Sequence, residues 1–149
     1  MAELYFEDFP QGRVFDTAGI TVTEAAIIEF AHRYDPQPFH LDVEAARRSE
    51  IFGELVASGF QTLCLSFRLF TQLNILGNNL GGPGVDAVRW PRPVRAGDTI
   101  QCRVTVTEAR PSRSKPDRGI ITWGFETFNQ HGEVVMTALS MSFLKRREA

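Results

Sequence analysis

Residues 60–76 read FQTLCLSFRLFTQLNIL and form the most apolar long segment of the chain. The apolar side chains of this segment fall on nearly every face of a helix, a pattern that is typical of a helix buried on all sides. A helix of this length extends for about 25 Å. We expect a sheet to curl around it, because a helix that is apolar all round has to be covered all round.

The strands of such a sheet are predicted on both sides of the helix. Residues 13–22 are rich in β-branched side chains, and four later segments combine β-branched and aromatic residues between turn sequences. Antiparallel hairpins with one segregated helix are typical of the α+β class. Because no repeat or low-complexity segment divides the chain, we expect one domain over residues 1–149. The four later segments are residues 85–90, 99–109, 119–129 and 133–144.

Two short helices are predicted between the first strand and the long helix. Thr23 precedes residues 24–31 and Asp42 precedes residues 43–48, and both are residue types that cap the N-terminus of a helix. The sequence DPQP at residues 35–38 ends the first of these helices. A residue before proline is pushed out of the α-helical conformation, so this segment is expected to be extended.

Composition excludes several classes of protein. The chain of 149 residues carries 16 Lys and Arg against 18 Asp and Glu, a formal net charge of −2. A general nucleic-acid binder presents a basic face instead. No apolar run reaches the roughly 20 residues of a membrane span, and the acidic N-terminus does not resemble a signal peptide. Cys64 and Cys102 lie in apolar stretches without CxxC spacing and are expected to be buried thiols. We therefore expect a cytoplasmic protein that binds neither nucleic acid nor membrane.

The densest chemical signal is the sequence YDPQPFH at residues 34–40. It places a carboxylate, Asp35, and an imidazole, His40, on a loop stiffened by two prolines. A general acid–base pair has to be held within hydrogen-bonding reach of one water, and a stiff loop meets that requirement. The spacing alone leaves a second interpretation open, in which Asp35 caps a turn and His40 is a satisfied polar residue under the loop.

A second signal is Gly59, which follows Ser58 directly before the long helix. The first N–H groups of a helix have no partner within the helix and carry partial positive charge. Because Gly59 has no side chain, its N–H can point at an incoming carbonyl oxygen, as an oxyanion hole requires. The alternative is that Gly59 only lets the chain turn into the helix.

Together these segments resemble the MaoC-like dehydratases, the family that includes the (R)-specific enoyl-CoA hydratases. The resemblance covers nearly the whole chain and implies a hot-dog fold, in which a highly curved antiparallel sheet wraps around one long helix. The sequence DPQPFHLD at residues 35–42 resembles the catalytic D-x-N-P-x-H-x-D pattern of the family. Other similar stretches are YFEDF at residues 5–9, FG at 52–53, VASGF at 56–60, RPV at 92–94 and GDT at 97–99.

The resemblance implies roles for three residues. Asp35 and His40 match the family residues that hold and activate the catalytic water, and Gly59 matches the glycine whose N–H binds the thioester oxygen. The implied activity is the reversible addition of water to a trans-2-enoyl thioester of coenzyme A, a lyase reaction of fatty acid metabolism. Neither a metal nor an organic cofactor is expected, because the thioester itself acidifies the carbon beside the carbonyl. Coenzyme A is then part of the substrate.

Two positions depart from the family pattern. Gln37 stands where the family has Asn, and Ser58 stands where it has His before the glycine. Both are expected to line the substrate site and to affect the preferred acyl group. Phe60 and Leu63 follow Gly59 on the helix and are expected to border an acyl tunnel. The alternative is that these apolar side chains pack in the core, as such helix positions usually do.

Basic side chains are candidates for binding the phosphates of coenzyme A. Arg113 and Lys115 lie in a loop predicted over residues 110–118, and Arg92 lies near the end of a predicted strand. The alternative is a solvated loop, because exposed charges usually interact only with water. No set of His, Cys and acidic residues has the spacing of a metal site, so no metal is expected.

Two other functions remain open on the sequence alone. A hot-dog acyl-CoA thioesterase would use a carboxylate to activate water against the carbonyl carbon. A non-catalytic acyl-thioester binding module would bind the ligand without turnover. The spacing of Asp35 and His40 favours the hydratase, whereas Gln37 and Ser58 keep the binding module open. The resemblance also implies a homodimer or larger homo-oligomer, because a lone curved sheet leaves an edge unpaired.

Overall fold

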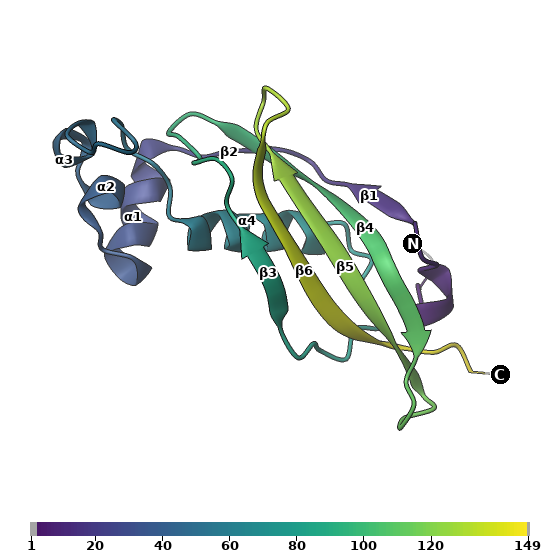
Figure 1. Ribbon diagram of the computed structural model, residues 1–149. Coiled ribbons are helices and arrows are strands. Elements are labelled where there is room, and N and C mark those ends of the chain that lie inside the picture. The colour runs from purple at the N-terminus through teal and green to yellow at the C-terminus, as the bar shows by residue number, and fades with distance from the viewer. Residues whose placement is uncertain (1–2, 149) are drawn as a thin grey trace.

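The computed structural model describes residues 3–148, and within them six strands form an antiparallel sheet that lies across one long helix (Figure 1). The strands follow the order β1-β4-β5-β6-β3, and β2 pairs with the start of β4. This arrangement confirms the α+β class and the curved sheet around one helix. The elements in chain order are a 3₁₀ helix (Phe6–Asp8), β1 (Val14–Asp16), β2 (Ile20–Thr21), α1 (Glu24–Tyr34), α2 (Pro38–Leu41), α3 (Val43–Arg47), α4 (Gly59–Thr71), β3 (Val85–Arg89), β4 (Thr99–Pro111), β5 (Arg118–Phe128) and β6 (Val134–Lys145).

The predicted first strand is divided into β1 and β2. The Thr17 side-chain oxygen accepts a hydrogen bond from the Cys102 N–H at 2.9 Å, in place of a backbone carbonyl. The ladder with β4 is therefore interrupted between the two short strands. Strands β3 to β6 lie within a few residues of their predicted ranges.

The short helices α1 and α3 begin directly after the capping residues that the sequence predicts. Thr23 Oγ1 accepts a hydrogen bond from the Ala26 N–H at 3.1 Å, and Asp42 Oδ1 accepts one from the Glu44 N–H at 2.9 Å. These bonds satisfy N–H groups that a helix leaves free at its start. The one-turn helix α2 was not predicted, because residues 38–41 carry no apolar period of their own.

The long helix α4 is shorter and less covered than the sequence predicts. It ends at Thr71 rather than Leu76, because the last turn tightens and Asn74 adopts a left-handed conformation with φ 56°. The segment that follows packs beneath the sheet instead. Cys64 is exposed, contrary to expectation, whereas Cys102 is buried as predicted. Phe60 and Phe67 are 58 % and 42 % exposed, so one face of α4 is only partly covered by the rest of residues 3–148.

Two apolar cores hold the elements together. The larger one lies between α4 and strands β4 to β6 and contains an aromatic group formed by Phe9, Phe70, Trp123 and Phe125. The smaller one contains Ile27, Ala46, Leu55, Val94 and Ile100, and it joins the short helices to one end of the sheet. This smaller core fixes the segment around residues 35–40 against the start of α4. No described helix is long and apolar enough to cross a membrane.

A β-bulge interrupts the edge strand β3. Asp86 pairs with Leu139 and Arg89 pairs with Thr137, so the three-residue step in β3 faces a two-residue step in β6. Within the bulge, Ala87 adopts a left-handed conformation with φ 51°. Side chains other than glycine are strained in this conformation, because Cβ approaches the following carbonyl.

Substitutions at Ala87 test this strained conformation. Ala87→Gly is expected to keep or raise the free energy of unfolding, by at most about 1 kcal/mol, because glycine adopts positive φ freely. Ala87→Val is expected to lower it by about 1–3 kcal/mol, because a β-branched side chain is more strained there. Urea unfolding of the three proteins measures both effects. Equal stability of the two variants would show that residue 87 is not held at positive φ.

Candidate active site

Asp35 and His40 come together because the chain turns into the one-turn helix α2 shortly after Pro36. Asp35 caps the C-terminus of α1, and its N–H donates to the Ala31 carbonyl at 2.9 Å. Gln37 precedes α2, and one helical turn later His40 Nε2 lies 3.4 Å from Asp35 Oδ2. The two side chains are 14 % and 7 % exposed, so the pair is largely shielded from solvent.

The protonation of the His40 ring follows from its buried partner. His40 Nδ1 lies 2.6 Å from the Val56 carbonyl oxygen. Because a carbonyl oxygen can only accept a hydrogen bond, Nδ1 has to carry a proton. Nε2 is then the nitrogen that can take or give a proton on the side of Asp35.

Asp35 is held by two further hydrogen bonds. The Ser58 hydroxyl donates to Oδ2 and the Gln37 amide donates to Oδ1, each at 2.7 Å. Burial would raise the pKa of this carboxyl, but the two hydrogen bonds and the electrostatic interaction with the neighbouring His40 ring outweigh burial and hold the pKa below its ordinary value. The charged carboxylate therefore stabilises the fold at neutral pH, and that contribution is lost as the pH falls through the lowered pKa.

Ser58 also fixes the start of α4. Its Oγ accepts a hydrogen bond from the Phe60 N–H at 3.2 Å, which makes Ser58 the capping residue of the helix. Among the hydrogen bonds of residues 3–148, none uses the N–H of Gly59, the next residue. A Cβ added at Gly59 would lie 2.6 Å from Trp90 Cδ2 and 2.8 Å from Trp90 Cζ2. Only glycine fits here, and its free N–H lies at the positive end of the helix dipole.

These polar groups line one pocket with a volume of about 440 Å³. Asp35, His40 and Gly59 line it, and the other lining side chains are mostly aromatic, aliphatic or proline. A mostly apolar pocket with a few convergent polar groups is the usual form of a small-molecule site. The remaining lining residues are Gln37, Phe39, Ile51, Phe52, Val56, Ala57, Phe60, Thr62, Trp90, Pro91, Arg92, Pro93 and Val94.

The structure brings some of the predicted binding residues to this pocket and not others. Phe60, Gln37 and Arg92 line it, and Arg92 also pairs with Glu133 at 3.0 Å. Ser58 lies behind the lining, fully buried against Asp35. Leu63 is not a lining residue, because it faces the larger core instead of an acyl tunnel.

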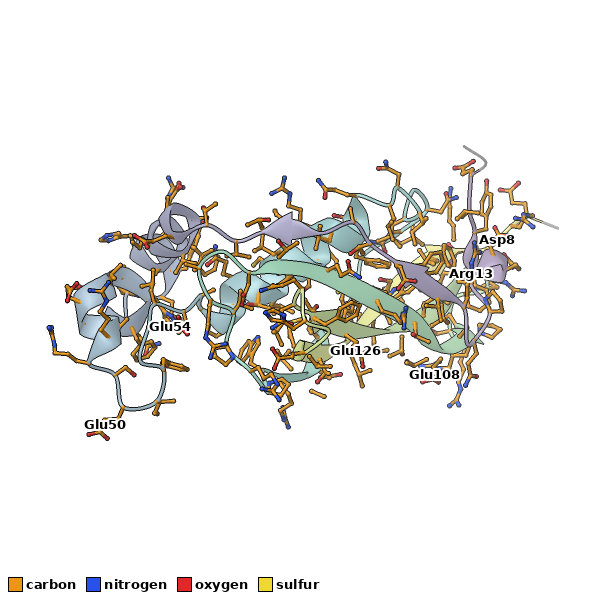
Figure 2. All side chains as sticks on the ribbon, turned by 90° about the horizontal axis from the view of Figure 1, so that it is seen from above. Asp8, Arg13, Glu50, Glu54, Glu108 and Glu126 are labelled. Atoms are coloured by element: carbon orange, nitrogen blue, oxygen red, sulfur yellow. The ribbon has the colours of Figure 1, made fainter. Side chains whose placement is uncertain are left out.

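The predicted basic residues Arg113 and Lys115 lie far from the pocket within one chain. They belong to the hairpin between β4 and β5, at the end of the molecule opposite the short helices (Figure 1). Figure 2 shows the same separation, with Glu54 at the end formed by the short helices and Glu108 near the hairpin. Arg95, in contrast, lies at the pocket end and pairs with Glu54.

Several pocket residues were not predicted from the sequence. Trp90 is the most informative of them, because it lies against Gly59. Its sequence context, Trp90-Pro91-Arg92-Pro93, repeats the two closely spaced prolines of residues 35–38 and could have indicated a second stiff segment. Phe39 and Phe52 pack together at 5.2 Å between ring centroids, which only the tertiary structure shows.

Residues 3–148 contain no group of three or more His, Cys, Asp or Glu side chains placed to hold a metal ion. His32 and His131 lie on other elements and do not line the pocket.

Comparison with known proteins identifies relatives of the whole chain. The family described as MaoC like domain matches residues 8–125. The solved structure of a MaoC-like dehydratase from Rhodospirillum rubrum superposes with a TM-score of 0.90 and 42% identity, over 98% of this chain and 99% of that chain. The uncharacterized protein YdeM of Bacillus subtilis is 32% identical over 95% of this chain and 98% of its own length. The (R)-specific enoyl-CoA hydratase of Rhodospirillum rubrum is 32% identical over 73% of this chain and 74% of its own length.

Removal of the Ser58 hydroxyl tests the electrostatics of the pair. Ser58→Ala takes a hydrogen bond from the charged carboxylate while Asp35 stays buried, so the pKa of Asp35 is expected to rise. Titration of ¹³C-labelled Asp carboxyls by NMR measures this pKa, with Asp35→Asn to assign the signal. Ser112→Ala, in the distant hairpin, is the matched control and leaves the pKa unchanged. An unchanged pKa in Ser58→Ala would contradict the role given to this bond.

Proposed function

The chain belongs to the family of MaoC-like domains, and from this membership we propose that it adds water reversibly to a trans-2-enoyl thioester of coenzyme A. One observation carries the proposal: a carboxylate–imidazole pair that is largely shielded from solvent and a free helix N-terminal N–H line the same mostly apolar pocket. Addition of water to a conjugated thioester needs both a group that moves a proton and a donor for the carbonyl oxygen.

Gly59 stabilises the thioester carbonyl oxygen in this reaction. When water adds at C3, negative charge develops on the carbonyl oxygen as an enolate. The Gly59 N–H and the dipole of α4 stabilise that charge, because both are aimed at the pocket before the substrate binds. The absence of a side chain at Gly59 lets the oxygen approach the N–H closely.

Asp35 and His40 bind and activate the water molecule. A water molecule between them donates its hydrogen bonds to the Asp35 carboxylate and to His40 Nε2. As the water oxygen bonds to C3 of the enoyl chain, a water proton passes to His40 Nε2. The same proton then bonds to C2, and the enolate returns to the thioester. The Nδ1–H bond to Val56 keeps the ring oriented throughout. Asp35, ionised by its lowered pKa, stabilises the imidazolium that forms in between.

Variants of the pair test this assignment. Asp35→Asn and His40→Ala are each expected to lower kcat/KM for hydration about 10²–10⁴-fold, as loss of a general acid–base group does. The loss of enoyl-thioester absorbance over a panel of acyl chain lengths measures the rate. Asp117→Asn and His131→Ala change the same residue types away from the pocket and are expected to keep the wild-type rate.

Three outcomes separate the functions that the sequence leaves open. Hydration by the wild type that is lost in both variants supports the hydratase. Release of free coenzyme A with no hydration would identify a thioesterase instead. Tight binding of acyl-CoA without any turnover, unchanged in Asp35→Asn, would identify a binding module.

We also propose that the chain acts as a homodimer. The uncovered face of α4 and the edge strand β3 meet at a hollow that Phe67 and Val85 both line, and both side chains are more than 40 % exposed. A second copy would cover this apolar surface and pair the open edge of the sheet. Phe60 lies on the same helix as Phe67, so the pocket would lie near the interface.

The mass in solution tests the homodimer. Light scattering is expected to give twice the 16.7 kDa of one chain. Phe67→Asp is expected to give the single-chain mass, because the buried interface would then hold an unpaired charge. Leu139→Asp makes the same kind of change on the other face of the sheet and is expected to remain dimeric. A monomeric wild type at micromolar concentration would contradict the proposal.

A further inference from the structure

Trp90 lies beside the free N–H of Gly59. Its indole atoms fill the space that a side chain at residue 59 would occupy. In a helix the Cα–Cβ bond tilts toward the N-terminus, and the N–H of the first residue points the same way. An oxygen that accepts a hydrogen bond from Gly59 therefore comes to lie against the indole.

The bulge in β3 is what turns Trp90 toward α4. Asp86 and Arg89 pair with Leu139 and Thr137, which are two residues apart and lie on one face of β6. Asp86 and Arg89 therefore share the outer face of the sheet, although they are three positions apart in the sequence. Val88 consequently faces inward, where it packs on the larger core, and Trp90 continues on the same side. Without the bulge, the alternation of the strand would place Arg89 inward and Trp90 outward.

The indole is a fixed wall of the pocket. Trp90 precedes Pro91, which restricts its backbone to extended conformations. The Phe60 ring packs edge-to-face against it at 5.7 Å between centroids. Trp90 is 41 % exposed, so these contacts on the side of α4, together with Gly59, and not burial, hold the indole in place.

We propose that Trp90 is a specificity-determining residue that selects acyl thioesters with no branch at the carbon next to the carbonyl. The inference rests on the proposed function, in which Gly59 holds the thioester oxygen. The neighbouring carbon then lies close to the indole. A hydrogen on that carbon fits beside the ring, whereas a methyl group widens the acyl chain into the space that the indole occupies.

The test compares substrates that differ by one methyl group. Values of kcat/KM for hydration of trans-but-2-enoyl-CoA and its 2-methyl derivative are measured for the wild type, Trp90→Ala and Trp90→Phe. The wild type is expected to prefer the unbranched thioester at least about 10-fold, the effect of one methyl group in a tight pocket. Trp90→Ala is expected to lose that preference by gaining rate on the branched substrate, and Trp90→Phe to keep most of it. An equal loss of rate on both substrates in Trp90→Ala would show that the indole only supports the fold, and would overturn the inference.

A binding measurement separates this inference from the proposed function. Calorimetry gives the affinities of butyryl-CoA and 2-methylbutyryl-CoA, which differ by one methyl group at C2 and cannot be hydrated. Tighter binding of butyryl-CoA to the wild type, at least about 10-fold, and its loss in Trp90→Ala support the role of Trp90 even if no hydration is found. Equal affinities in the wild type, or binding of neither thioester, would overturn the inference.

Discussion

The geometry of the pocket depends on the two hydrogen bonds of one buried side chain, Ser58. Its Oγ accepts from the Phe60 N–H, which sets where α4 begins, and its hydroxyl donates to Asp35, which sets the carboxylate at the end of α1. Because Ser58 is fully buried, a break in either bond would leave a polar group without water as a substitute. The same residue thereby fixes Asp35 and His40 relative to the free N–H of Gly59.

Neighbouring backbone groups extend this constraint to the sheet. The Val56 carbonyl accepts from His40, and the Val56 N–H donates to the Phe39 carbonyl at 3.2 Å. The Ala57 N–H donates to the Val94 carbonyl at 2.8 Å, which ties the segment to the wall that carries Trp90. The two sides of the pocket are therefore held at a fixed separation before any ligand binds, as a site that stabilises charge in a transition state requires.

The parts of the site that local sequence determines could be predicted. Asp35 and His40 are close in the chain and separated by prolines, so spacing alone suggested their proximity, and Gly59 was recognised from its place before an apolar helix. Leu63 and Cys64 show the limit of this reasoning. An apolar helix face looks the same in sequence whether its own sheet covers it, as for Leu63, or the described residues leave it exposed, as for Cys64.

Trp90 could not be placed from sequence for a different reason. Its direction depends on the bulge at Ala87, and alanine at positive φ leaves no trace in the sequence of the kind that Gly or Asn would. Arg113 and Lys115 were grouped with the site by charge, but the length of β4 and β5 carries their hairpin to the other end of the sheet. A run of charged residues indicates that a segment is exposed to solvent. Where that segment lies relative to the pocket depends on the topology of the sheet.

In the proposed reaction, water adds across the double bond while the thioester stays intact. Proton NMR of trans-but-2-enoyl-CoA incubated with the wild-type protein in D₂O tests it most directly. The expected product is a 3-hydroxybutyryl thioester that carries one deuterium at C2, and no such product is expected with His40→Ala. Free coenzyme A, or unchanged enoyl thioester with the wild-type protein, would contradict it.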